Sequence, residues 1–329
     1  MTGVLRGTRP GLIARRPSLR GLARGVLEQV VLRTGAAWLA RRRRRGEALV
    51  LAYHNVLPDG AAPAGERTLH LSLRAFIRQV EWVTRTHEAV PLADVLTPAG
   101  GGHRPRVAIT FDDAYRGAVV LAVDELVKRG VPATIFVAPA LLGCDGFWWD
   151  RLAEPATGVV APEARRHALE ALGGSHEAVC AWAAQQGRPE PELPPFAKPA
   201  TEDELRLAAS RPGITLGSHS WSHPNLSRLG ADELARELSR PLAWLHQRFP
   251  TVLPWLAYPY GIASAAVEAA ARDGGYAAAL LVAGGWLPPG RARRYALPRL
   301  NVAAGLSDGG FVLRTSGLLA GRQRTMEGG

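Results

Sequence analysis

The sequence has few cysteines, no long apolar run and no internal repeat. Cys144 and Cys180 are the only cysteines among 329 residues, so a disulfide framework is excluded, and the two thiols could form one bond or stay free. No apolar stretch reaches the roughly 20 residues that a membrane-spanning helix needs. The lack of a repeating unit argues against a repeat architecture. The fold of this chain therefore has to be held by an apolar core.

The composition supports a core of that kind. Apolar residues make up 47% of the chain, and nine tryptophans are present. A chain of this length can hold one barrel-sized domain or two small ones.

Acidic residues are scarce only at the amino-terminal end. The chain has 40 basic and 29 acidic residues, and its formal net charge is +11. Twelve arginines and a single acid, Glu28, lie in residues 1–46, which leaves 28 basic and 28 acidic residues in the rest. The excess charge therefore belongs to an amino-terminal arm, and no nucleic-acid partner is expected for the main domain.

Residues 1–46 have the features of a basic arm. Residues 1–20 are rich in Arg, Gly and Pro, a composition typical of disorder. An amphipathic helical pattern over residues 21–40 is followed by five arginines, Arg41 to Arg45. A secretory signal has its basic residues before the apolar segment, so we do not expect a cleaved export signal.

This arm has two interpretations. In the first, residues 21–46 adhere to anionic lipid, which would place the protein in the cytoplasm or at the inner face of the membrane. In the second, the helix packs on the main domain and carries a solvated charged tail. The sequence leaves both open, and a location in the cell envelope is a further alternative.

The centre of the chain carries a strand that ends in two acids. Residues 107–111 are mostly β-branched or apolar and predict a buried strand. Asp112 and Asp113 follow it, and a helical pattern runs from Tyr115 to Lys128. Such strand ends are where α/β folds place their chemistry. Asp113 could merely cap the helix, but two neighbouring carboxylates need a positive partner, of which a metal ion is the simplest.

A second predicted strand, residues 213–218, ends close to a pair of histidines. His219 and His223 are four residues apart, so one helical turn or a tight loop can direct both imidazoles to one point. Neutral imidazole suits zinc and neighbouring divalent ions. A pair at this spacing is a weak signal by itself, and its position at a second strand end strengthens it.

Strands and helices alternate along the main domain. We expect strands at residues 48–56, 107–111, 133–138, 213–218, 253–258, 276–282 and 297–302. We expect helices at residues 71–87, 115–128, 163–172, 232–249 and 264–272, with a capping box at Thr201 and an interruption near Pro241. This order predicts parallel pairing through right-handed crossovers, and hence an α/β fold, a distorted or incomplete (β/α) barrel of about seven parallel strands.

The domain boundaries follow from the same pattern. We divide the chain into a basic arm, a barrel and a loose tail, at residues 1–46, 47–315 and 316–329. Residues 143–200 interrupt the alternation and are interpreted as an insertion over the barrel mouth. Within it, Trp148 and Trp149 could line a glycan groove, although packing against the barrel is the commoner role of large aromatic residues.

Three motifs, in this order, resemble one enzyme family. They are Thr110-Phe111-Asp112-Asp113, His219-Ser220-Trp221-Ser222-His223-Pro224 and Ala257-Tyr258-Pro259-Tyr260-Gly261. Together they resemble the NodB-like polysaccharide deacetylases, carbohydrate esterase family four, over about residues 49–302. The layout is closest to the poly-N-acetylglucosamine deacetylase branch, which has an early Tyr-His pair like Tyr53-His54. The resemblance implies the same barrel fold and metal-dependent hydrolysis of N-acetyl or O-acetyl groups on sugar polymers.

The resemblance also implies roles for individual residues. Asp113, His219 and His223 would be the metal ligands, with Zn²⁺ as the expected ion and Co²⁺ or Ni²⁺ as alternatives. Three protein ligands leave positions open for water and substrate. Asp112 would be the general base that takes a proton from the attacking water. Tyr260 would donate its backbone N–H to the oxyanion.

The sequence departs from the family pattern at two positions. Ala257 stands where the family has an arginine that holds the catalytic aspartate. Arg299 could supply that cation, because an arginine within an apolar strand needs a buried partner; a surface ion pair is the alternative. The family's late histidine, which acts as the general acid, is missing, since no histidine follows His246. His54 is the candidate for this role, because imidazole titrates near neutral pH and relatives with an early Tyr-His pair use it in this way.

We therefore predict a hydrolase acting on carbon–nitrogen bonds other than peptide bonds, with an acetylated, glucosamine-containing glycan as its substrate. The missing motif residues leave two alternatives. One is a glycan-binding protein of the same fold without turnover. The other is a metal amidohydrolase that acts on a small non-sugar amide.

Overall fold

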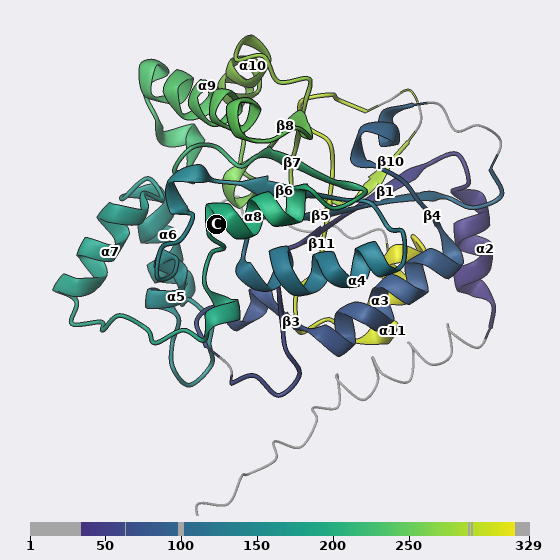
Figure 1. The fold of residues 1–329 in the computed structure, drawn as a ribbon, viewed down its shortest axis with the longest axis horizontal. Coiled ribbons are helices and arrows are strands. Elements are labelled where there is room, and N and C mark those ends of the chain that lie inside the picture. Colours follow the sequence, from purple (N-terminus) through teal and green to yellow (C-terminus); the bar gives the residue numbers. More distant parts are fainter. Residues whose placement is uncertain (1–33, 63, 98–101, 289, 291, 320–329) are drawn as a thin grey trace, which may run out of the picture.

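The structure is a computed structural model that describes residues 34–62, 64–97, 102–288, 290 and 292–319 (Figure 1). Most of the predicted arm and tail, residues 1–33 and 320–329, lies outside the described residues. The described part of the arm contains helix α2 (Ala36–Arg43). Among the helices of the described residues, none has the length and apolar character needed to cross a bilayer.

Eleven strands are present in the described residues. One sheet holds nine of them: β1 (Ala48–Tyr53), β4 (Glu88–Ala89), β5 (Arg106–Phe111), β6 (Ala133–Val137), β7 (Ile214–Ser218), β8 (Val252–Ala257), β9 (Ala278–Leu280), β10 (Trp286–Leu287) and β11 (Leu300–Asn301). The other two, β2 (Asn55–Leu57) and β3 (His70–Ser72), pair with each other.

The main sheet curls into a distorted barrel, which confirms the predicted fold class. Its strand order is β10-β1-β5-β6-β7-β8-β9, with β4 beside β5 and β11 beside β1. Strands β1, β5, β6, β7, β8 and β9 are parallel, as expected when helices and loops connect successive strands. Strand β10 runs antiparallel to β1, so the sheet is mixed.

Residues 297–301 lie between strands β9 and β1. Leu297 is bridged to Leu280 of β9, and Leu300 of β11 pairs with Leu51 of β1. This segment therefore bridges β9 and β1. Arg299, between its two contacts, is fully buried.

Helices cover the outside of the barrel (Figure 1). They are α3 (Leu73–Thr86), α4 (Val123–Lys128), α8 (Glu202–Ala209), α9 (Ala231–Arg248), α10 (Ala265–Asp273) and α11 (Asp308–Thr315), and a π-helical turn precedes α4 at Ala118–Ala122. The insertion forms α5 (Trp148–Leu152), α6 (Pro162–Glu170) and α7 (His176–Gln185), at the left of Figure 1. Short 3-10 helices lie at Arg67–Leu69, Leu92–Leu96, Pro139–Leu141, Pro195–Ala197, Leu226–Arg228 and Pro259–Gly261.

Polar side chains fix the starts of two helices. The Ala75 N–H donates to Ser72 Oγ at the start of α3, at 3.3 Å. Thr201 and Glu204 form the predicted capping box of α8. In each case the side chain satisfies a backbone N–H that the first helical turn leaves without a partner.

The predicted interruption near Pro241 is wrong, because α9 is continuous through it. Proline removes one backbone hydrogen bond from a helix and disfavours its interior. The apolar face of α9, with Leu238 and Leu245 fully buried against the domain, keeps the helix intact. Tertiary packing thus outweighs the local preference.

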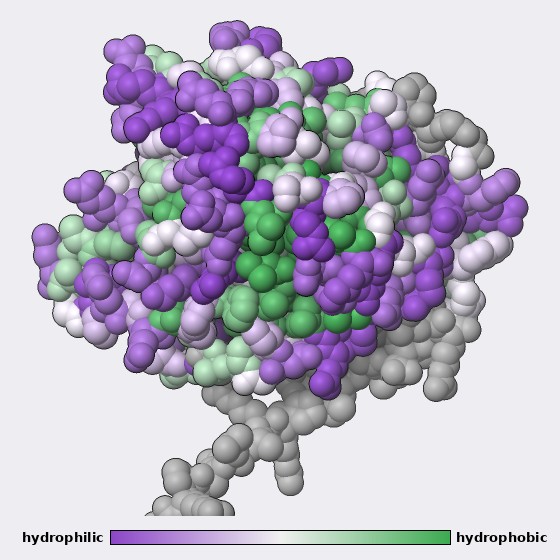
Figure 2. Space-filling model, in the orientation of Figure 1, coloured by the Kyte–Doolittle hydropathy of each residue, from purple (hydrophilic) through white to green (hydrophobic). Residues whose placement is uncertain are grey.

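Hydrophilic side chains cover most of the face drawn in Figure 2, and hydrophobic ones are exposed in its middle, over α4 and α8. Leu207 of α8, at 67% exposure, is the most exposed of the large apolar residues described. Beneath these helices, the largest core cluster joins the main sheet to α3, α4, α8 and the insertion. This core fixes the strand ends on which the site is built.

His87 gives the stability of this fold a specific pH dependence. Its ring is fully buried, with Nε2 2.9 Å from the Thr315 carbonyl oxygen and Nδ1 2.8 Å from Thr86 Oγ1. Burial lowers the pKa of His87 to about 4, against roughly 6.5 in an unfolded chain. Below pH 6.5 the unfolded state therefore takes up a proton that the folded state resists, and stability is lost as the pH falls towards 4.

We expect His87→Gln to destabilise the protein more at pH 6.5 than at pH 5, by about 2 kcal/mol. Chemical denaturation of both proteins at the two pH values measures this difference. The control is His246→Gln, because His246 is exposed, and it should change the free energy of unfolding by no more than about 0.5 kcal/mol. A pH-independent effect of His87→Gln would contradict this assignment.

Candidate active site

The strand ends bring two of the predicted site residues to one edge of the sheet. Tyr53 of β1 pairs with Phe111 of β5, and the Asp112 N–H donates to the Tyr53 carbonyl at 2.9 Å. His54 and Asp112, the next residue on each strand, therefore leave the sheet side by side. Both lie at the carboxyl end of the parallel strands, where barrels of this type bind their ligands.

The turns at this edge have an unusual backbone. Among the described residues other than glycine, five have a positive φ: Asp113, Ala114, Ser220, His223 and Tyr260. All five lie in or next to the three sequence motifs described above. A residue with a Cβ is strained in such a conformation, typically by roughly 1–3 kcal/mol. The surrounding structure therefore holds these turns in specific shapes.

Asp113, His219 and His223 converge at this edge. The Asp113 Oδ1 atom lies 3.4 Å from His219 Nε2 and 3.2 Å from His223 Nε2. The two Nε2 atoms are 3.1 Å apart, and all three side chains are buried. Among the described residues, this is the one group of three His, Cys, Asp or Glu side chains close enough to share an ion.

These three side chains fit a divalent metal ion. Tetrahedral ligands at about 2.0–2.1 Å from zinc lie about 3.4 Å from one another, close to the separations of 3.1, 3.2 and 3.4 Å here. Two imidazoles and one carboxylate suit zinc and neighbouring divalent ions. Asp113 Oδ1 is buried and has no hydrogen-bond partner among the described residues. A buried oxygen of this kind needs a partner, and an ion would supply it.

Neighbouring groups hold both imidazoles in place. His219 Nδ1 lies 2.7 Å from the Ala257 carbonyl oxygen and has to donate to it, which leaves the lone pair of Nε2 for a ligand. The ring of His223 packs against Trp149 and Tyr260, with centroid distances of 5.2 and 4.6 Å. The site is thus ordered by the protein itself.

The charges of this cluster favour the protonation states that ligands need at Asp113 and His223, but not at His219. Burial alone would raise the pKa of Asp113, but the two neighbouring imidazoles lower it well below its ordinary value. Burial lowers the pKa of His223. For His219, burial is outweighed by Asp112 and Asp113, which raise its pKa. Asp113 is therefore ionised and His223 neutral at pH 7, as metal binding requires.

The other carboxylate, Asp112, is bound by Arg299. Arg299 Nη1 donates to Asp112 Oδ1 at 2.6 Å, and Nη2 donates to Oδ2 at 2.8 Å. The guanidinium also donates to Thr110 Oγ1 and to the Leu281 carbonyl, both at 3.2 Å. Arg299 thus lies in the interior against Asp112 and not in a surface ion pair.

This ion pair keeps Asp112 charged. Burial would raise the pKa of Asp112, but the nearby charges of Arg299 and His219 hold it below its ordinary value. A carboxylate that is ionised at neutral pH and held by a bidentate hydrogen bond can accept a proton in a defined direction.

The remaining predicted side chains line the same cavity, which has a volume of about 260 Å³. His54 is half-buried at its wall, and its ring makes no hydrogen bond to any other described residue. The lining residues are His54, Thr68, Leu69, Asp112, Asp113, Trp149, Arg165, His219, His223, Tyr260, Gly261, Val282 and Asn301. The structure therefore gathers every predicted side chain around one space, with Arg299 behind Asp112.

Tyr260 has a strained backbone and an anchored side chain. Its φ is 59°, and its hydroxyl accepts a hydrogen bond from Trp148 Nε1 at 2.9 Å. The same hydroxyl lies 3.0 Å from the His223 carbonyl and 3.1 Å from the Gly174 carbonyl. None of the backbone hydrogen bonds between described residues uses the Tyr260 N–H, which leaves it available to a ligand.

The sequence profile of the polysaccharide deacetylase family matches residues 99–279, more than half of the chain. The chain belongs to the polysaccharide deacetylase family. It is therefore a hydrolase that removes acetyl groups from glycans. A comparison with curated proteins finds no match.

Solved structures share the fold. A deacetylase of Streptococcus pyogenes, PplD in complex with acetate, is 17% identical with a TM-score of 0.55, and the match covers 86% of this chain and 99% of PplD. IcaB from Ammonifex degensii is 17% identical with a TM-score of 0.56, covering 84% and 98%. A de-N-acetylase from Aggregatibacter actinomycetemcomitans is 15% identical with a TM-score of 0.55, covering 82% and 99%.

The structure decides two questions that the sequence left open for this deacetylase. Asp113 does not cap the following helix, because helical structure begins at Arg116 and the residue directly before it is Tyr115. Trp148 and Trp149 are not an exposed pair, since they are 1% and 4% exposed. They pack the insertion against the barrel, and Trp149 reaches the cavity wall from there.

Sequence reasoning missed Arg165, which lines the cavity from helix α6 of the insertion. Its Nη2 donates to Glu66 Oε2 at 2.8 Å. Glu66 is 1% exposed and also accepts hydrogen bonds from Thr68 Oγ1 and the Val160 N–H. A helix inserted between two strands has no fixed register on the barrel, so no spacing pattern could have placed this guanidinium.

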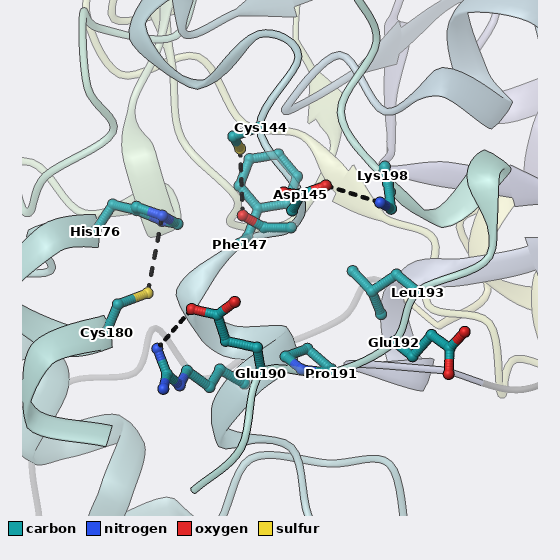
Figure 3. Close-up of a pocket in the computed structure, with 12 residues that line it drawn as sticks. Cys144, Asp145, Phe147, His176, Cys180, Glu190, Pro191, Glu192, Leu193 and Lys198 are labelled. Carbon is teal, nitrogen blue, oxygen red and sulfur yellow. Dashed lines mark hydrogen bonds and ion pairs between the residues drawn. The ribbon is translucent and has the colours of Figure 1, made fainter. Parts of the chain in front are cut away.

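A second cavity, of about 300 Å³, lies within the insertion (Figure 3). Cys180 Sγ is 3.8 Å from His176 Nε2, and Cys144 Sγ donates to the Gly146 carbonyl at 3.2 Å. Both thiols are free, which settles the question that the sequence left open. Burial raises the pKa of each thiol, so both are protonated at neutral pH.

Removing Arg299 tests the ion pair. We expect Arg299→Met to lower the free energy of unfolding by about 3–5 kcal/mol, because it leaves Asp112 buried without a partner. Replacing both residues, as Arg299→Met with Asp112→Leu, should restore part of this loss. Thermal or chemical denaturation measures both effects.

The control is Arg248→Met, which breaks an ion pair whose side chains are both 38% exposed and should cost less than about 1 kcal/mol. If Arg299→Met unfolds as the wild type does, the pair does not hold the site.

Proposed function

We propose that this deacetylase hydrolyses N-acetyl groups on a glucosamine-containing polysaccharide or glycan precursor with the help of a divalent metal ion; O-acetyl groups are the alternative target. The observation that carries the proposal is the separation of two neighbouring carboxylates. Asp113 faces two imidazoles, whereas Asp112 is held by Arg299. One carboxylate is thus available to an ion and the other to a proton.

The ligands of the ion would be Asp113, His219 and His223. A divalent ion, which we propose to be Zn²⁺ with Co²⁺ or Ni²⁺ as alternatives, would act when bound as a Lewis acid toward the acetyl carbonyl and would acidify a water. Every other part of the reaction is assigned to side chains and backbone of this chain.

Asp112 is the proposed general base. It accepts a proton from the water that attacks the acetyl carbon, and Arg299 keeps both of its oxygens in a fixed direction. The Tyr260 N–H donates to the oxygen on which negative charge develops. When the bond between carbon and nitrogen breaks, the amine leaves with a proton from His54, which lines the same cavity.

The size of the cavity indicates how much of the substrate it holds. Its volume of about 260 Å³ is below the roughly 300–1,000 Å³ of pockets for drug-sized ligands. It therefore accommodates one acetylated sugar unit, and neighbouring units of a polymer would lie outside it. One of the solved structures with this fold is a de-N-acetylase, which supports an amide as the target.

Metal content and acetate release together test the function. We expect purified protein to bind about one divalent ion per chain, to release acetate from an acetylated glucosamine oligomer, and to lose this activity with a chelator. Adding back Zn²⁺ or Co²⁺ should restore it. Metal-free protein that binds the oligomer without turnover would favour a glycan-binding protein, and activity on small non-sugar amides alone would favour another amidohydrolase.

His54→Asn tests the general acid. We expect kcat to fall by about 10²–10⁴-fold, because the imidazole that protonates the leaving amine is lost. Metal content and substrate binding should stay close to wild type, because the variant leaves the proposed metal ligands unchanged. His103→Asn is the control, since His103 is exposed and far from the cavity lining. Turnover of His54→Asn near wild type would remove His54 from the mechanism.

Adhesion of residues 21–46 to anionic lipid, and with it a location in the cytoplasm or at the inner membrane face, stays a prediction.

A further inference from the structure

A pocket at the other end of the barrel is lined mostly by basic side chains. Its volume is about 180 Å³. Five guanidinium groups and one imidazole line it, and its described lining contains no acidic residue. The lining residues are Trp38, Arg41, Arg42, Arg45, Arg85, Thr86, His103, Arg104 and Pro105.

Three segments that are distant in sequence build this pocket. Helix α2 and the turn after it provide Arg41, Arg42 and Arg45, the end of α3 provides Arg85, and the turn before β5 provides His103 and Arg104. These segments lie at the amino ends of β1 and β5, whereas the active site lies at their carboxyl ends. Six residues of strand separate the two ends, which is about 20 Å.

The arginines of this pocket have no anionic partner among the described residues. Arg44, which is outside the lining, pairs with Glu47 at 2.6 Å, but none of the five lining arginines forms a described ion pair. Arg41 Nη1 and Arg45 Nε are buried and have no hydrogen-bond partner among the described residues. Buried polar atoms without partners are rare and costly, so a missing acceptor is indicated.

Aromatic rings and carbonyl groups hold several of these side chains in position. The Arg41 guanidinium lies over the Trp82 ring at 5.0 Å, and that of Arg42 lies over the Trp38 ring at 5.2 Å. Arg104 Nη1 donates to the Thr84 carbonyl at 3.0 Å. An array of like charges that is fixed in this way repels itself unless an anion binds between them.

We propose that this pocket binds a phosphate group, carried either by a phospholipid headgroup or by a soluble phosphate. Guanidinium groups match the geometry of phosphate oxygens through paired hydrogen bonds. Trp38 and Leu39, on the same helix, are 55% and 47% exposed. Exposed aromatic and aliphatic residues beside arginines are typical of helices that lie at a lipid interface, which favours the headgroup as the source.

The pocket is independent of the proposed catalytic function. Its residues touch none of the ligands or acids at the active site, so variants in it should leave acetate release unchanged. Failure of the phosphate site would therefore not affect the proposed hydrolysis, and failure of the hydrolysis would not affect phosphate binding.

The test uses the full chain and two probes. Co-sedimentation measures binding to vesicles of phosphatidylglycerol mixed with phosphatidylcholine, and to phosphatidylcholine alone. Calorimetric titration measures binding of inorganic phosphate. The pocket variant is Arg41→Gln with Arg45→Gln, which keeps much of each side-chain stem, and its folding is checked by thermal denaturation. The matched control is Arg15→Gln with Arg16→Gln, which removes the same charge from outside the described residues.

We expect binding to the anionic vesicles but not to phosphatidylcholine alone, and a loss of affinity of at least tenfold in the pocket variant. The control should lose no more than about threefold. If the pocket variant fails to fold, Arg42→Gln with Arg85→Gln replaces it, since both side chains are exposed.

Another outcome is that the full chain binds inorganic phosphate saturably but binds no vesicles, and that the pocket variant loses the phosphate binding. That result would support the phosphate site and would identify a soluble phosphate as its ligand. Equal losses in the pocket variant and the control would show charge attraction without a pocket and would overturn the proposal. Absence of binding to both probes would overturn it as well.

Discussion

The site depends on one buried ion pair, between Arg299 and Asp112. Both side chains are shielded from water, and two hydrogen bonds of 2.6 and 2.8 Å join them. Arg299 comes from the segment that links the last strand of the barrel to the first. The segment that closes the barrel therefore also fixes a carboxylate at its mouth. Removing either partner would leave a buried charge uncompensated, which is among the costliest changes a protein core can undergo.

This pair explains how two adjacent aspartates coexist in the interior. The backbone turns sharply at Asp113, whose φ is 67°, so the two carboxylates meet different partners. Arg299 neutralises Asp112, and the imidazoles of His219 and His223 surround Asp113. Each acid stays ionised because its own neighbours outweigh the effect of burial. The strained turns are the structural cost of this separation.

Much of this arrangement could be predicted from the sequence, because strand ends in a parallel sheet meet at one edge. The apolar run before Asp112 and the spacing of His219 and His223 indicated the two central strands and the side chains that follow them. The position of Arg299 inside an apolar segment indicated a buried partner. These signals are local, since each rests on residues close together in the chain.

Other features could not be predicted because they depend on how distant segments pack. Arg165 reaches the cavity from an inserted helix whose position on the barrel leaves no periodic trace in the sequence. Pro241 suggested a break in a helix that the buried face of α9 keeps continuous. The run of arginines at residues 41–45 showed a basic segment, but not that Arg85 and Arg104 complete a pocket with it.

Anomalous X-ray diffraction from a crystal soaked in Zn²⁺ would test the central claim most directly, because it locates the ion independently of activity. The expected result is a single strong peak among Asp113 Oδ1, His219 Nε2 and His223 Nε2, with the Asp112 carboxylate still on Arg299 and off the metal. A peak bound by Asp112, or no peak at these three atoms, would contradict the separation of the two acids on which the proposed chemistry rests.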